Sequence, residues 1–225
     1  MLTKLPRWVE YGAFVLAFVA GNVNAVGLMG FKHQSISHLS GTATLLGTGL
    51  ADGSLSSALH LLGVLLSFLF GAAISGVLLP NGALKLGRHY DTLLVLEACL
   101  LLTSIIFLNN GSLAGHYTAS LACGLQNALA STYSGAVVRT THVTGIFTDL
   151  GLMLGAKLRG KPFDERKAIL FILIIIGFVL GGALGAYLFS LWQFFALTVP
   201  AGICLILAVG YRFYRVGVRR NLCVP

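Results

Sequence analysis

Two short segments of the chain repeat one pattern of histidine, hydroxyl and glycine residues. Residues 38–47 read HLSGTATLLG and residues 142–151 read HVTGIFTDLG, and the two stretches align without a gap. Imidazole and hydroxyl groups both donate and accept hydrogen bonds, and glycine lets a solute or another backbone approach closely. The pattern is typical of a polar binding site formed twice. Its matched positions are His38 with His142, Ser40 with Thr144, and Gly41 with Gly145.

Ionisable residues near these segments and inside apolar stretches add a second kind of chemistry. Asp149 lies seven residues after His142, about two helical turns, so the two share one helix face; the first copy has Leu45 there. Glu97 lies inside an apolar stretch, and Arg139 lies just before the second copy. Because burying charge in a bilayer is costly, we interpret Asp149 and Glu97 as proton carriers or charge partners, and Arg139 as their partner or an anion ligand. The alternatives are a neutral Glu97 bonded to another helix and an ordinary cytoplasmic Arg139.

The composition identifies the class of protein. Of the 225 residues, 56% are hydrophobic and only 10% are charged, whereas an ordinary globular domain has about 25% charged residues. We therefore predict an all-α polytopic membrane protein whose partner is the lipid bilayer, with residues 1–225 forming a single membrane domain. The net charge of +8 is assigned to loops and ends that set orientation, which excludes a nucleic-acid partner.

The apolar runs differ in length, and the short ones coincide with the repeated pattern. Segments 39–52 and 142–156 reach only about 21–23 Å as helices, less than a hydrocarbon core of about 30 Å. The runs long enough to span are residues 9–29, 55–79, 90–109, 112–134, 166–190 and 192–212.

The distribution of basic residues favours one topology. If the short segments do not cross and the N-terminus is cytoplasmic, fourteen Lys and Arg residues lie inside and only Lys32 lies outside. If both short segments cross, the ratio falls to eleven against four. The positive-inside rule therefore favours six transmembrane helices plus two re-entrant half-helices, with the N- and C-termini cytoplasmic.

The similarity extends beyond the half-helices. GNVNAVG at residues 21–27 aligns with GLQNALA at 124–130, which matches Asn24 with Asn127, and FLFGAAISG at 68–76 aligns with FVLGGALGA at 178–186. In the favoured topology the two copies enter the membrane from opposite sides. We therefore predict two inverted repeats, an architecture whose binding site lies at the repeat interface. The first covers residues 9–109, the second covers 112–212, and a basic cytoplasmic tail follows at 213–225.

These stretches carry a resemblance to a known family. The chain resembles the YoaK-like bacterial inner-membrane proteins, a family of unknown function, over nearly its whole length. Similar proteins more typically read HMTGN in the first motif, where this chain has Ser40 and Thr42. The resemblance implies a multi-pass protein of the bacterial inner membrane and brings no established activity. Its marks are GNVNAVG, SHLSGTATLLG, QNA and RTTHVTGIFTDLG.

A helix that begins inside a membrane exposes up to four backbone N–H groups and the positive end of its dipole. Two such ends meeting between the repeats would form a compact polar site, with Asn24 and Asn127 beside it. The leading hypothesis is a channel or secondary transporter for a small polar solute, with a small anion or weak acid favoured. A purely structural role of the same polar groups, in satisfying buried backbone, is the alternative.

Other functional classes are less well supported. HExxH, nucleophile-elbow and P-loop patterns are missing from the sequence, so we do not expect an enzyme. Its four cysteines lack CxxC or zinc spacing, so we expect neither a metal nor another cofactor. A non-transporting membrane scaffold or accessory subunit is the runner-up. A homodimer is expected because one six-span unit is small.

Overall fold

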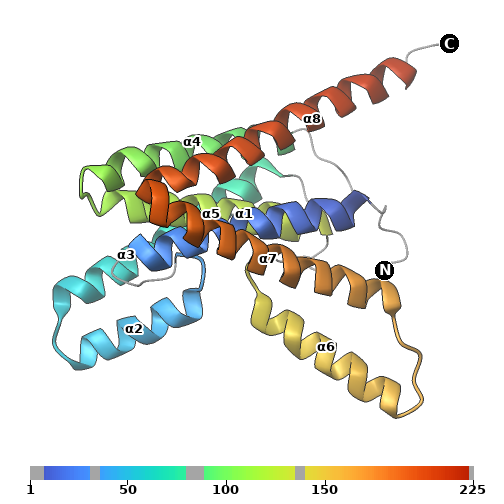
Figure 1. The fold of residues 1–225 in the computed structure, drawn as a ribbon, viewed down its shortest axis with the longest axis horizontal. Coiled ribbons are helices and arrows are strands. Elements are labelled where there is room, and N and C mark those ends of the chain that lie inside the picture. Colours follow the sequence, from blue (N-terminus) through green and yellow to red (C-terminus); the bar gives the residue numbers. More distant parts are fainter. Residues whose placement is uncertain (1–7, 31–35, 80–88, 135–139, 223–225) are drawn as a thin grey trace.

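The computed structural model describes residues 8–30, 36–79, 89–134 and 140–222 (Figure 1). In these ranges the chain is helical, without any strand. The short helices are α2 (Leu39–Ala51) and α6 (Val143–Leu158), and a 3-10 turn, η2, covers Gln193–Leu197. The long helices are α1 (Trp8–Gly30), α3 (Leu55–Leu78), α4 (Tyr90–Asn109), α5 (Ala114–Ser134), α7 (Glu165–Trp192) and α8 (Thr198–Leu222).

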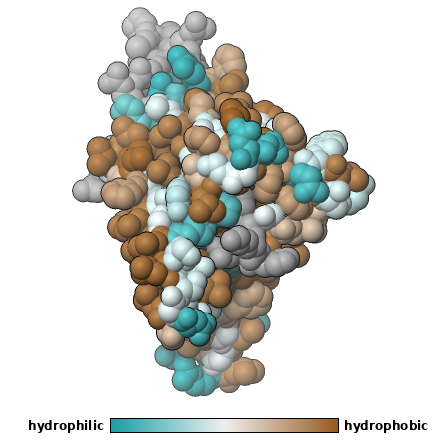
Figure 2. All heavy atoms as spheres, turned by 90° about the vertical axis from the view of Figure 1, so that its left-hand side faces the viewer, coloured by the Kyte–Doolittle hydropathy of each residue, from teal (hydrophilic) through white to brown (hydrophobic). Residues whose placement is uncertain are grey.

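The all-helical, membrane-like class predicted from the sequence is confirmed. Among the described residues, four helical segments are long and apolar enough to cross a membrane: 10–30, 55–78, 90–109 and 165–215, the last joining α7, η2 and α8. Large apolar side chains such as Leu69 and Ile106 remain about 60% exposed. Figure 2 shows hydrophobic side chains over much of one face, as expected of a surface that meets lipid.

One expected span, residues 112–134, is not among these segments within the described part of the chain. The corresponding helix α5 carries polar residues along its length, including Ser120, Gln126 and Asn127. The Ser120 and Gln126 side chains are almost completely buried by neighbouring helices. The helix is therefore an interior element, and its polar groups find partners in the protein rather than in lipid.

Two helix pairs form the frame of the bundle through direct backbone contact. In the α1–α7 pair, Gly21 lies against the backbone carbonyl of Phe178. In the α3–α5 pair, Gly124 lies against the carbonyl of Phe68. A Cβ atom at either glycine would overlap the opposing carbonyl, so only glycine permits this approach. Gly181 facing Phe18 and Gly71 facing Leu121 continue the two contacts.

The order of contacts gives the directions of the helices. Phe14 faces Gly177 and Phe18 faces Gly181, so α1 and α7 run parallel. Gln126 of α5 donates from Nε2 to the carbonyl of Leu16 in α1 at 3.2 Å. Figure 1 shows α1 and α5 running through the bundle in opposite directions. Hence α5 runs antiparallel to α1.

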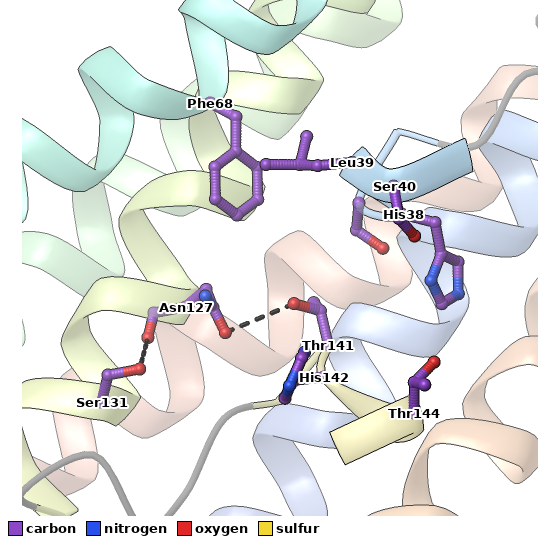
Figure 3. A pocket seen from close by; sticks show the side chains of 10 residues that line it. His38, Leu39, Ser40, Phe68, Asn127, Ser131, Thr141, His142 and Thr144 are labelled. Atoms are coloured by element: carbon purple, nitrogen blue, oxygen red, sulfur yellow. Dashed lines mark hydrogen bonds between the residues drawn. The ribbon is translucent and has the colours of Figure 1, made fainter. Parts of the chain in front are cut away.

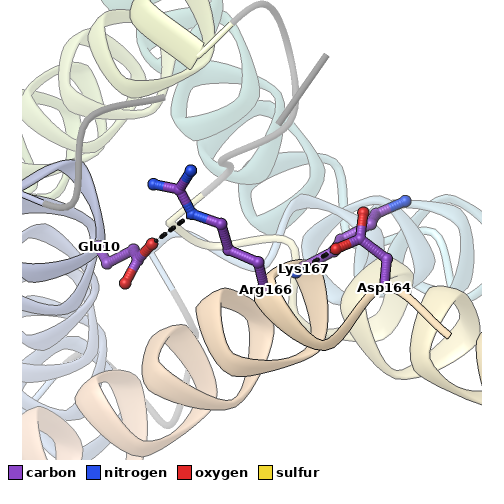
Figure 4. A network of polar contacts seen from close by, with 4 residues as sticks. All are labelled: Glu10, Asp164, Arg166 and Lys167. Carbon is purple, nitrogen blue, oxygen red and sulfur yellow. Dashed lines mark hydrogen bonds and ion pairs between the residues drawn. The ribbon is translucent and has the colours of Figure 1, made fainter. Parts of the chain in front are cut away.

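At one end of the bundle, polar contacts hold the start of α7 (Figure 4). The Asp164 carboxylate accepts a hydrogen bond from the backbone N–H of Lys167 at 3.0 Å and so caps α7. One residue before Lys167, Arg166 pairs through Nε with the Glu10 carboxylate of α1 at 2.9 Å. This ion pair joins the first turns of α1 and α7.

The two short helices leave the bundle in opposite directions (Figure 1). Both begin near its middle; α2 runs toward the turn that precedes α3, and α6 runs toward the opposite end, where α7 starts. Much of α6 is exposed, including Leu152 and Leu158.

The observed boundaries agree with the expected segments to within a few residues, except at both ends of α8, which continues to Leu222, ten residues past the expected end and into the expected tail. The expected segment began at residue 192, whereas α8 begins at Thr198. The chain reverses through η2, in which Gln193 adopts a left-handed φ of 51° and Leu197 is fully buried.

Candidate functional site

The N-terminal turns of α2 and α6 open onto one shared cavity of about 540 Å³. In Figure 3 both turns approach it from one side, Asn127 and Ser131 of α5 lie opposite, and Phe68 and Leu39 bound it above. Eight of the ten lining residues have polar side chains, and none of those described is Asp, Glu, Lys or Arg. Its members are Ser37, His38, Leu39, Ser40, Phe68, Asn127, Ser131, Thr141, His142 and Thr144.

A buried asparagine fixes the entrance to α2. The Oδ1 atom of Asn24, in α1, accepts hydrogen bonds from the backbone N–H of Ser37 at 3.3 Å and from its Oγ at 2.9 Å. Both residues are less than 10% exposed. Asn24 is therefore placed behind the cavity wall, where it positions the residue that precedes His38.

The entrance to α6 is built in the same way. The Oδ1 atom of Asn127, in α5, accepts a hydrogen bond from Oγ1 of Thr141 at 3.3 Å. One turn further along α5, Ser131 donates from Oγ to the carbonyl of Asn127 at 2.7 Å. Asn127 thus positions the residue before His142 and also lines the cavity itself.

The two histidines occupy the N-cap positions of α2 and α6, and neither caps its helix with its side chain. The His38 ring packs edge-on against Phe178, with centroids 5.7 Å apart. The His142 ring instead lies over Gly145, in the space that a Cβ atom would fill, whereas the equivalent space at Gly41 is open. The N-terminal turns of α2 and α6 therefore have similar residues and differ in the orientation of the imidazole.

Backbone donors complete the lining. The first helical hydrogen bonds run from the N–H of Thr42 to the carbonyl of His38 and from that of Ile146 to His142. The N–H groups of the three preceding residues in each helix have no intrahelical acceptor. Together with the helix dipoles, they favour a solute that accepts hydrogen bonds or carries negative charge.

The ionisable residues singled out in the sequence lie away from this cavity. Asp149 is half-exposed and pairs with Nζ of Lys167 at 3.8 Å. Glu97 is 2% exposed and lies beside Cys204 of α8 and Cys123 of α5, with one carboxyl oxygen, Oε2, accepting no hydrogen bond from a described residue. Arg139 lies outside the described residues.

Other lining residues were not among the predicted site residues. Ser37 and Thr141 each precede the motif histidine and could have been found as the partners of the matched asparagines. Ser131 lies one turn after Asn127 and could have been found by helical spacing. Phe68 gave no signal of its own, because an aromatic residue in an apolar stretch usually marks packing. No group of three or more potential metal ligands is assembled within the described residues.

A sequence model of one family, described as "Protein of unknown function (DUF1275)", matches residues 12–210. No curated protein and no solved structure matches the chain.

Proposed function

We propose that this chain, which belongs to the DUF1275 family of proteins of unknown function, is a channel or secondary transporter for a small polar solute. The observation that carries the proposal is the shared cavity, to which two short helices contribute the same residue types from matching positions. In a membrane protein, polar side chains gathered at the ends of short helices mark a candidate functional site.

The architecture assigned to this function is two inverted repeats, residues 9–109 and 112–212, with six spanning helices and re-entrant α2 and α6. Three observations support it: the opposite directions of α2 and α6, the antiparallel arrangement of α1 and α5, and matched glycine contacts. The mid-bundle position of both N-terminal turns agrees with short segments that stop halfway.

The proposed location is the bacterial inner membrane, with both termini cytoplasmic, as the YoaK-like resemblance implies. The first turn of α1 and the last turns of α8 lie at the same end of the bundle. The connection between α6 and α7, whose sequence includes basic residues such as Lys161, is at this end too. A cytoplasmic assignment of this end satisfies the positive-inside rule.

The lining also narrows the class of solute. Hydroxyls, imidazoles and an amide can donate and accept hydrogen bonds, and the exposed N–H groups add donors. A cation would find no carboxylate among the described lining residues. We therefore favour a small anion or weak acid over a neutral solute, and both over a cation.

Flux into reconstituted vesicles tests this proposal. Vesicles that contain the protein should admit small weak acids such as formate and acetate, measured by light scattering and an entrapped pH dye. His38→Ala and His142→Ala should each lower the flux at least about tenfold, because each removes a lining side chain at an N-terminal turn. His89→Ala is the matched control, since His89 also occupies an N-cap position, that of α4, and does not line the cavity.

Equal loss of flux in the His89 variant would mean that the effect is not specific to the cavity. Vesicles that stay impermeable to anions, weak acids and neutral polyols, although they contain folded protein, would overturn the proposal. That result would favour a scaffold or accessory subunit.

A further inference from the structure

A second polar cluster lies where α3 packs on α5, toward the end opposite the Glu10–Arg166 pair. Nδ1 of His116 lies 3.0 Å from Nε2 of His60, and Nδ1 of His60 lies 3.1 Å from the hydroxyl of Tyr117. The two imidazole centroids are 4.9 Å apart, and His116 is only 9% exposed. Three titratable side chains thus form one hydrogen-bonded chain.

The fold does not require these three hydrogen-bonded side chains. In the aligned α1–α7 pair, position 60 corresponds to Leu170, and positions 116 and 117 correspond to Ala13 and Phe14. Leu170 and Ala13 are buried in one apolar cluster there. The same backbone packing is therefore achieved with apolar residues, so helix packing alone does not account for the two histidines and the tyrosine.

We propose that His60, His116 and Tyr117 form a proton-binding site that responds to acidity on the outer side of the membrane. When the cluster is uncharged, the Tyr117 hydroxyl donates to Nδ1 of His60, whose Nε2–H donates to Nδ1 of His116. One added proton makes His60 a cation that donates to both neighbours, with the Tyr117 oxygen now accepting. Both hydrogen bonds of the cluster are kept in this step.

A second proton cannot be accommodated in the same geometry. With both imidazoles protonated, an N–H of His116 would point at an N–H of His60 across 3.0 Å. Two positive charges at this distance in a buried site repel strongly. The cluster can therefore bind one proton without losing a hydrogen bond, and binding the second requires the two rings to separate.

The carboxylates of α1 and α4 contact other groups. Glu10 of α1 pairs with Arg166 at the other end of the bundle, and Asp91 of α4 is 3.5 Å from Arg215 of α8. Glu97 of α4 lies beside Cys204. Among the described residues, this leaves Asp52, exposed in the turn between α2 and α3, as the carboxylate at the same end.

The cluster is linked to the cavity through one continuous contact between α3 and α5. One turn beyond His60, the carbonyl of Val64 accepts a hydrogen bond from Oγ of Ser120 at 2.8 Å. The next turn brings Phe68 against Gly124, and Phe68 lines the cavity. Separation of α3 from α5 at the histidines would therefore change the cavity wall. This link to transport rests on the proposed function, whereas proton binding by the cluster does not.

Nitrogen-15 NMR of histidine-labelled protein in nanodiscs tests the site between pH 8 and pH 4. His60 and His116 should titrate in two coupled steps separated by more than about one pH unit. In His116→Ala the remaining His60 should titrate in a single step. Unchanged midpoints for each histidine after removal of the other would overturn the proposal.

A matched variant separates this site from the transport cavity. His60→Leu with His116→Ala copies Leu170 and Ala13 of the other pair and should keep its thermal stability and its flux at pH 8. Flux of the native protein should change at least about threefold across the second titration step, and the double variant should lose this dependence. If the double variant fails to fold, Tyr117→Phe, which copies Phe14, should still shift the first step.

The two proposals fail in distinguishable ways. Coupled titration without flux of any solute would refute transport and leave the proton site standing. Flux that remains constant through both titration steps would refute the link between the site and the cavity.

Discussion

The α1–α7 and α3–α5 pairs make the same central contact and differ at their ends. In both, a glycine lies on a phenylalanine carbonyl, at Gly21 and Gly124. One pair ends in the Glu10–Arg166 ion pair, and the other carries the His60–His116–Tyr117 chain. Backbone contact fixes the geometry of both pairs, so the residues at the ends are free to differ. Differences between the pairs therefore point to function, and similarities point to the fold.

The largest expected effect is that of filling the central contact. Gly21→Ala and Gly124→Ala should each lower the free energy of unfolding by about 3 kcal/mol, because the new Cβ atom overlaps a carbonyl that only helix separation can relieve. Thermal unfolding in detergent measures the loss. Gly151→Ala is the control, because its Cβ would meet no atom within 4 Å. A loss confined to one pair would contradict the equivalence of the two contacts.

Removal of the asparagines should have a smaller effect, mainly on stability at Asn24 and mainly on flux at Asn127. Asn24→Ala and Asn127→Ala each leave a buried hydroxyl without its acceptor, at a cost of about 1–3 kcal/mol. Asn24→Ala should cost more, since Oδ1 of Asn24 accepts two hydrogen bonds from Ser37. Asn127→Ala should reduce flux more, since Asn127 also lines the cavity. Thermal unfolding and vesicle flux, measured on the same preparations, separate the two roles; the reverse order in either would refute the assignment.

The smallest expected effect is at the ion-paired end. The Glu10 and Arg166 side chains are 19% and 32% exposed, and a pair this accessible contributes about 0.5 kcal/mol that salt screens. Glu10→Gln should therefore lower the melting temperature slightly at low salt and not at high salt. The native protein should also lose stability at its histidine end on acidification, which Glu10→Gln should leave unchanged. If Glu10→Gln abolished the acid response, the titrating group would belong to the α1–α7 pair, and its assignment to the histidines would be refuted.

The sequence was sufficient to predict the elements that depend on hydrophobic length and local pattern. The polar motif and its short segments correspond to α2 and α6, and the N-terminal turns of both helices line one cavity. The matched residues Asn24 and Asn127 hydrogen-bond to Ser37 and Thr141, and only Asn127 lines the cavity. These features follow from periodicity and spacing, which a single sequence contains.

Other features depend on contacts between distant parts of the chain. His60 and His116 are far apart in sequence, and the aligned residues Leu170 and Ala13 are apolar, so the repeated pattern did not single out either histidine. Asp149 shares a helix face with His142 in projection, yet its carboxylate pairs with Lys167 on the neighbouring helix. The reversal near residue 191 was expected, whereas the 3-10 turn over Gln193–Leu197, which delays the start of α8 to Thr198, was not.

The pairing of α1 with α7, which follows much later in the chain, has a consequence for the order in which the helices assemble. Helix α1 leaves the ribosome first, but its partner α7 starts only at Glu165. At about 5–20 residues per second, α1 waits roughly 7–27 s in the membrane with its glycine face uncovered. The α3–α5 pair closes much earlier, because Ala114 follows soon after Leu78. Assembly should therefore proceed from the centre of the chain outward, and a nascent chain stalled before α7 would be the form most exposed to quality-control proteases.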